Sequence, residues 1–136
     1  MQPRKESVAF IINYQDHVLL GKKASGIDDS LAGKWHIPAG TKKLGETDLA
    51  AIVREAKEET LLIVKPGKFI SKYTTDKGTL LRWYECAAPH GLPKARSDLV
   101  AVRWVLPKEV KNYLEPSVYA SWTPQLHAYF TQKNLD

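Results

Sequence analysis

One stretch in the middle of the chain, residues 48–60 (DLAAIVREAKEET), repeats its apolar residues at the 3.6-residue period of an α-helix. The apolar runs before and after it are instead rich in β-branched and aromatic residues, which is typical of strands. A short chain that combines several strands with one central helix is restricted to the mixed fold classes. The sequence therefore predicts an α+β domain, completed by one or two helices near the C-terminus.

The remaining elements are predicted from the same patterns. We expect strands at residues 7–14 (SVAFIINY), 17–23 (HVLLGKK), 79–88 (TLLRWYECAA) and 99–105 (LVAVRWV). Residues 61–75 (LLIVKPGKFISKYTT) predict a strand, a turn and a second strand. Pro107 opens a short helix, and an amphipathic helix is expected to start around Ser117 and to break near Pro124.

The size and charge of the chain restrict its partners. Its 136 residues predict a single domain over 1–136, because no linker divides them. The formal net charge of +5 favours anionic partners, but the lysines lie in small separate clusters rather than in the long basic run of a nucleic-acid arm. With Cys86 as the only cysteine, and neither an apolar secretory signal nor a membrane-spanning run, we expect a cytoplasmic location.

The predicted helix has two faces, one apolar and one acidic. Thr47 is a suitable N-cap for it. Glu55, Glu58 and Glu59 follow each other at i, i+3 and i+4, which places three carboxylates side by side. The stripe that we expect to pack inward consists of Leu49, Ile52, Val53, Ala56 and Thr60.

Two interpretations of the acidic face are open. Like charges at this spacing destabilise a helix by about 0.2–0.5 kcal/mol per pair, although glutamate-rich solvated helix faces are common. Alternatively, the carboxylates together suit a hard divalent cation such as Mg²⁺, which prefers oxygen ligands. The glycine-bearing loop at residues 40–46 (GTKKLGE) leads directly into the helix, and in a basic chain this favours a metal-bridged phosphate site.

From Gly40 to Leu62 the chain resembles the Nudix box: Gly, five residues, Glu, seven residues, Arg-Glu, an aliphatic, any residue, Glu-Glu, any residue, Gly and an aliphatic. The positions that match are Gly40, Glu46, Arg54, Glu55, Ala56, Glu58, Glu59 and Leu62. The preceding GKWHIPAG is similar to the tryptophan-aliphatic-proline-glycine-glycine segment of the family. The resemblance implies the Nudix fold, an α/β/α sandwich with a mixed central sheet and a C-terminal helix. It also implies an enzyme that hydrolyses a nucleoside diphosphate linked to another moiety.

Two positions depart from the family pattern. Leu61 stands where the family has a glycine at the end of the helix. We therefore expect a different turn or backbone strain there, because αL geometry costs a residue other than glycine about 1–2 kcal/mol. Ala39 replaces the first glycine of the usual pair, and its backbone carbonyl remains suitable as a metal ligand if its φ is negative.

The resemblance implies a metal site and the residues around it. The expected cofactor is Mg²⁺, or Mn²⁺ in its place. Arg54 is expected to pair with a glutamate of the box and orient it, and Glu46 to support the loop–helix junction or an outer-sphere water. The expected metal ligands are the carboxylates of Glu55, Glu59 and Glu58 and the backbone at Ala39 and Gly40.

The general base and the substrate contacts are less constrained by the motif. Asp98 is our candidate base, although a glutamate of the box takes this role in some relatives, and Glu85 is a further alternative. Lys23 lies where relatives place a cation that reaches a phosphate. Trp35 and Ile37 flank the start of the box and are candidate substrate contacts, although a large aromatic such as Trp35 is more often part of the core.

Three functions remain open at this stage. The first is a MutT-like (deoxy)nucleoside triphosphate pyrophosphohydrolase that releases the monophosphate, which the small size of the chain favours. The second is hydrolysis of ADP-ribose, a dinucleoside polyphosphate or a nucleotide sugar. The third is a nucleotide sensor without catalysis, which the intact set of glutamates disfavours. We expect a small nucleotide as partner, with neither a membrane nor a stable nucleic-acid partner, while a homodimer remains open.

Overall fold

The computed structural model describes residues 5–27 and 30–132. Within these ranges seven strands form one mixed sheet, in which β1 and β6 are parallel and the other pairs are antiparallel. The main path through the sheet is β3-β2-β1-β6-β5, with β4 beside β1 and β7 beside β2. The strands are β1 (Glu6–Tyr14), β2 (His17–Lys23), β3 (Trp35–His36), β4 (Ala39–Thr41), β5 (Lys65–Thr74), β6 (Leu80–Ala87) and β7 (Leu99–Val105).

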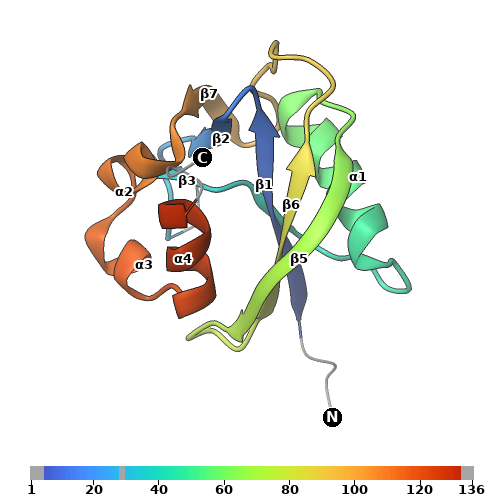
Figure 1. Cartoon of the computed structure of the whole chain (residues 1–136). Helices are drawn as coiled ribbons and strands as arrows, with labels where there is room; N and C mark the ends of the chain where they lie inside the picture. Colours follow the sequence, from blue (N-terminus) through green and yellow to red (C-terminus); the bar gives the residue numbers. More distant parts are fainter. Residues whose placement is uncertain (1–4, 28–29, 133–136) are drawn as a thin grey trace.

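Helices cover both faces of this sheet (Figure 1). α1 (Asp48–Thr60) lies on one face, and its bounds match those expected from the sequence. The other face carries a 3₁₀ turn, η1 (Pro107–Glu109), followed by α2 (Val110–Tyr113), α3 (Pro116–Ala120) and α4 (Pro124–Gln132). The three layers confirm the α/β/α sandwich. The expected break near Pro124 is also confirmed, because α4 starts at that residue.

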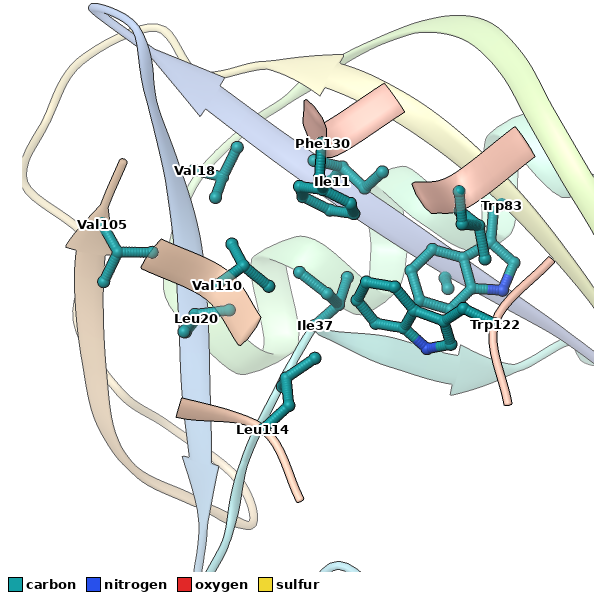
Figure 2. Close-up of a cluster of buried hydrophobic side chains, with 12 residues drawn as sticks. Ile11, Val18, Leu20, Ile37, Trp83, Val105, Val110, Leu114, Trp122 and Phe130 are labelled. Atoms are coloured by element: carbon teal, nitrogen blue, oxygen red, sulfur yellow. The ribbon is translucent and has the colours of Figure 1, made fainter. Parts of the chain in front are cut away.

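The central strand β1 is buried on both faces, which explains its continuous apolar sequence. Val8, Phe10 and Ile12 point into the core beneath α1, and the alternate residues Ala9 and Ile11 point into the core beneath α2–α4. Figure 2 shows this second core, where Phe130 from α4 lies over Ile11 and the rings of Trp83 and Trp122 lie next to each other.

A fork between β1 and β2 brings the first glycine of the box into the sheet. β1 and β2 pair only beside their two-residue turn, where Gln15 and Asp16 adopt the positive φ of a primed hairpin. Further along, β4 pairs with β1 and β3 pairs with β2. Residues 35–41 therefore fill the gap between the two strands and are held from both sides.

The structure corrects two predictions. Residues 61–64 form no strand, and β5 is one ten-residue strand with irregular register rather than two strands around a turn. The buried side of α1 consists of Ala51, Ile52, Ala56, Glu59 and Thr60, whereas Leu49 is 49% exposed. The helix is therefore rotated relative to the stripe expected from the large apolar residues. Packing of the small Ala51 against the sheet accompanies the turning of Glu59 into the interior.

No helix among the described residues has the length and apolar character needed to cross a membrane.

Candidate functional site

The first part of the site is a close approach between β4 and α1. Thr47 caps the helix as expected, because its Oγ1 accepts a hydrogen bond from the Ala50 N–H at 3.1 Å. The Glu55 side chain lies directly on the backbone of Gly40, where a Cβ atom would overlap the Glu55 carboxyl group. Position 40 therefore requires glycine for lack of space rather than for its φ angle.

Arg54 organises three of the four box glutamates. Its Nε and Nη2 donate to the two carboxyl oxygens of Glu46 at 2.7 and 2.8 Å, which is a bidentate pair. Nη1 donates to Glu55 at 2.9 Å and lies 3.3 Å from Glu58, whose side chain is half-exposed. Hydrogen bonds, first from Arg54 and then from the Lys43 N–H, lower the pKa of Glu46 to about 2.

Glu59 is the buried carboxylate of the cluster. Only 7% of the residue is exposed, and its Oε2 makes no hydrogen bond to the residues that the structure describes. Burial, with smaller contributions from the charges of Glu55 and Asp98, raises its pKa to about 8, although the charge of Lys23 opposes the rise. A buried carboxyl oxygen without a partner is costly, so this atom is suited to a cation.

A loop that is hydrogen-bonded to the end of α1 brings Asp98 close to Glu59. The Arg96 N–H donates to the Glu59 carbonyl and the Lys94 N–H to the Thr60 carbonyl, each at 2.9 Å, which satisfies two carbonyls at the end of α1. The Asp98 carbonyl in turn accepts from the Ala24 N–H at 2.8 Å. Lys23 Nζ lies 3.6 Å from Asp98 Oδ2, so the candidate base and the candidate phosphate contact are adjacent.

Glu85, the alternative base, has a different environment. It accepts a hydrogen bond from the Tyr129 hydroxyl at 3.1 Å, and Tyr129 in turn accepts from the Asn13 amide at 3.1 Å. These contacts favour a structural role in linking α4 to the sheet.

The register of β4 distinguishes the two candidate backbone ligands. The Phe10 N–H donates to the Pro38 carbonyl and the Lys42 N–H to the Glu6 carbonyl, so the hydrogen-bonded pairs alternate and include Gly40 opposite Val8. The Gly40 carbonyl therefore belongs to the ladder. The Ala39 carbonyl points the other way, to the side on which Thr41 O accepts from Arg54, and its φ is not positive.

The donor set fits a magnesium ion better than a metal that needs a complete protein cage. Among residues 5–27 and 30–132, no group of three or more His, Cys, Asp or Glu side chains is gathered closely enough to hold a metal alone. Magnesium usually takes only one or two carboxylates and completes its shell with waters and phosphate oxygens. The unpartnered oxygen of Glu59, the adjacent Glu55 and the Ala39 carbonyl meet that requirement.

An apolar cavity of about 150 Å³ adjoins the carboxylates on the other side of the sheet. Lys23 and Ala39 line it and connect it to the acidic side. Ile37, a candidate substrate contact, also lines the cavity. Trp35 does not, and its ring packs edge-on against Tyr113 at 6.1 Å, which favours a packing role. The sequence did not indicate two of the lining aromatics, Tyr73 and Trp83, because they come from β5 and β6, far from the motif.

Comparisons with known proteins agree with this architecture. Residues 3–126 match the family model described as NUDIX domain. The chain is 30% identical over 115 residues to a MutT-like protein of Streptomyces ambofaciens, a match that covers 84% of this chain and 71% of that protein. It is 27% identical over 111 residues to the CTP pyrophosphohydrolase of Escherichia coli, covering 79% of this chain and 80% of that protein.

Two further comparisons bear on substrate and fold. A 64-residue segment is 38% identical to the 8-oxo-dGDP phosphatase NUDT18 of Mus musculus, covering 47% of this chain but 19% of that protein. The crystal structure of the MutT protein from Methanosarcina mazei Go1 superimposes with a TM-score of 0.76 at 18% identity, covering 99% of this chain and 98% of that one. At that identity the likeness supports the fold alone.

Proposed function

Because this chain belongs to the Nudix family and is a hydrolase of pyrophosphate bonds, we propose that it converts nucleoside triphosphates into monophosphates with the help of Mg²⁺. One observation carries the proposal: the buried, unpartnered oxygen of Glu59 lies among Glu55, Asp98 and Lys23, next to an aromatic cavity. The carboxylates suit the metal-bridged phosphates, and the cavity suits the base. A mononucleotide needs only this one cavity for its base, whereas a dinucleotide would need a second cavity for its other base.

The residues that would hold the metal are Glu55 and Glu59, with the Ala39 carbonyl and, at the exposed rim, Glu58. When bound, Mg²⁺ would neutralise the polyphosphate and stabilise the charge that develops as water attacks phosphorus. Gly40 contributes space for the Glu55 carboxyl group rather than a ligand. Arg54 is a positioning residue, because its guanidinium holds Glu55 against the loop that Glu46 anchors.

Asp98 and Lys23 would act on the substrate itself. Asp98 is half-exposed and carried by a loop fixed to the end of α1, so its carboxylate can accept a proton from an attacking water near Glu59. Lys23 is mostly buried at 17% side-chain exposure, and its ammonium group can pair with a phosphate oxygen between the carboxylates and the cavity.

The substrate class is supported by the relatives. One is named a CTP pyrophosphohydrolase and another an 8-oxo-dGDP phosphatase, so each name gives a single nucleotide as the substrate.

The experiment that tests the proposal is a Mg²⁺-dependent assay of nucleoside monophosphate formation, with pyrophosphate as the second product from triphosphates, across ribo- and deoxynucleoside triphosphates, 8-oxo-dGTP, ADP-ribose, nucleotide sugars and dinucleoside polyphosphates. Glu59→Gln should lose more than about 100-fold in kcat/KM, beyond what the loss of an outer-shell partner usually costs. Asp76→Asn, an exposed carboxylate in the turn before β6, is the matched control. Saturable binding without turnover would contradict the enzyme and identify a sensor instead.

A pH–rate profile separates the candidate bases. Asp98→Asn should lower kcat by about 100-fold or more and remove the acidic limb of the profile, as expected for a general base. An unchanged kcat would exclude Asp98 and leave a glutamate of the box in that role.

A further inference from the structure

The cavity beside the carboxylates is small and shaped for a ring. Its volume is about 150 Å³, and its walls include the aromatic side chains of Tyr73, Trp83 and Trp122. Trp83 and Trp122 meet edge to face at 5.1 Å, as Figure 2 shows, so they form two walls at a steep angle. A cavity of roughly 150 Å³ in another protein accommodates benzene, a single six-membered ring. A single six-membered ring therefore matches this space more closely than a fused purine does.

The cavity also has a defined polar edge. The indole N–H of Trp83 is buried and has no well-aligned hydrogen bond. Burial raises the pKa of Tyr73, and the contact of its hydroxyl with this N–H lowers it. An indole N–H can only donate, so it requires an acceptor. The described lining includes no Asp, Glu, Asn or Gln side chain, so a ligand would compete for this donor with the Tyr73 hydroxyl and the His36 ring. A ligand with a carbonyl oxygen or an unprotonated ring nitrogen would satisfy this donor.

We infer, on the premise of the proposed function, that the cavity selects pyrimidine over purine nucleotides, with the Trp83 N–H donating to an acceptor on the pyrimidine ring. Uracil and cytosine each have one ring and acceptor atoms at its edge. Lys23 and Ala39, which the cavity shares with the carboxylate side, set the direction in which the phosphates leave it. Trp83 is thus a specificity-determining residue that lies on the opposite face of the sheet from the box helix.

Binding of the product monophosphates tests base selection without any metal. By isothermal titration calorimetry, CMP and UMP should bind wild-type protein at least about tenfold more tightly than AMP and GMP, since small changes of fit in a pocket are worth factors of about 10–200. The same order should appear in kcat/KM for the triphosphates with Mg²⁺. Equal or tighter binding of AMP or GMP would overturn the inference.

Two variants examine the size and the donor separately. Trp83→Phe keeps a ring but removes the N–H, and it should weaken CMP binding by about 3–10-fold, the value of one neutral hydrogen bond. Trp104→Phe, which removes an indole N–H bonded to the Gly91 carbonyl outside the cavity, is the matched control and should leave CMP binding unchanged. Leu81→Ala enlarges the cavity, so it should raise purine binding relative to pyrimidine binding by about tenfold.

The outcomes distinguish this inference from the proposed function. Pyrimidine-selective binding without hydrolysis of any triphosphate would refute the proposed reaction and support the base selection. Turnover of purine triphosphates in preference to CTP and UTP would leave the reaction standing and overturn the selection. If Trp83→Phe fails to fold, the wild-type comparison and Leu81→Ala still decide the question.

Discussion

At the scale of single residues, the site depends on how deeply Glu59 is buried. Its neighbours Glu55 and Glu58 each contact the Arg54 guanidinium, but no described residue pairs with Glu59 Oε2. Without a cation the carboxyl group is best accommodated with its proton. A cation bound at this oxygen, as proposed above, would therefore compete with the proton.

The first prediction follows from that competition. Because burial raises the pKa of Glu59 to about 8, Mg²⁺ binding near neutral pH should release close to one proton per protein. The apparent affinity should rise by up to about tenfold per pH unit below the pKa and level off above it. Titration calorimetry in two buffers with different ionisation enthalpies measures the release. Glu59→Gln should abolish it, and an equal release from that variant would contradict the assignment.

The same pKa has a consequence for the metal-free fold. The folded protein retains a proton that the unfolded chain loses above the ordinary carboxyl value of 4.5. This contribution to stability is therefore complete below that value and is lost as the pH rises toward about 8.

The second prediction concerns Gly40. Gly40→Ala places a Cβ atom on the Glu55 carboxyl group, so Glu55 must move away from β4. We expect activity to fall by more than about 100-fold, with a stability loss of about 1–3 kcal/mol from overpacking. Gly67→Ala, whose nearest contact would be 3.3 Å, serves as the control and should remain active. Steady-state kinetics with urea unfolding measures both effects, and full activity of Gly40→Ala would show that the close approach is dispensable.

Residue spacing predicted which carboxylates lie together but not their differing environments. The i, i+3, i+4 arithmetic places Glu55, Glu58 and Glu59 on one side of a helix whatever that side faces. Their differences arise from tertiary packing, because Glu59 lies on the buried side of the helix together with Ala51 and Ala56, whereas Glu58 is exposed. Trp83 and Tyr73 were not predicted as cavity residues for a similar reason. They become neighbours of the box through the pairing of β5 with β6, of β6 with β1 and of β1 with β4.

At the scale of elements, the end of α1 combines a strained backbone conformation with hydrogen bonds to a neighbouring loop. Leu61 occupies the αL cap with φ 63° and ψ 10°, and its N–H donates to the Lys57 carbonyl at 3.1 Å. The last two carbonyls of the helix, of Glu59 and Thr60, accept from the loop that carries Asp98. The strained cap therefore lies at the junction that fixes Asp98 relative to Glu59.

The third prediction is that this strain can be relieved. Leu61→Gly should be about 1 kcal/mol more stable than Leu61→Ala, because alanine keeps the αL penalty while glycine escapes it at some cost in unfolded-state entropy. The two variants lose the leucine side chain alike, so the comparison isolates the backbone term. Urea unfolding midpoints at constant m-value give the difference. If the alanine variant equals or exceeds the glycine variant, the cap is not strained.

The elements themselves were predicted to different degrees. The bounds of α1 followed from its cap and its period, which are local signals. The error at residues 61–64 arose because Leu62 and Val64 are buried beneath α1 in an irregular segment. A run of apolar residues indicates burial but does not separate a strand from a buried connection.

At the scale of the whole molecule, the three layers place the carboxylate cluster and the aromatic cavity on opposite faces of one sheet. Figure 1 shows α1 on one face of the sheet and α2–α4 on the other. The box carboxylates come from α1, whereas Leu114, Val118 and Trp122 from the α2–α4 region line the aromatic cavity. The chain as a whole carries a net charge of +5 although its site is acidic. Long-range attraction of a polyanionic substrate must therefore come from the surface lysines and arginines rather than from the site.

The fourth prediction is a salt dependence of this attraction. KM for a triphosphate should rise as NaCl is increased from about 0.01 to about 0.3 M, because the Debye length shrinks from about 30 Å to less than about 10 Å. kcat should change little, because the carboxylates and the bound phosphates would lie close together, where salt screens their interaction much less. Initial rates at several salt concentrations give both constants. Sucrose at matched osmolality should leave KM unchanged, and a KM independent of salt would contradict steering by the net charge.

The fork that holds residues 35–41 has a consequence for how such an enzyme can diversify. At Ala39 the backbone carbonyl faces the hydrolytic side, whereas the residue lines the cavity. The carbonyl of Ala39, which no substitution deletes, thus stays beside the carboxylates of Glu55 and Glu59, while the side chains that line the cavity can be exchanged by mutation. Substitution of single cavity residues during evolution can therefore change which base is preferred without altering the residues that hydrolyse the bond.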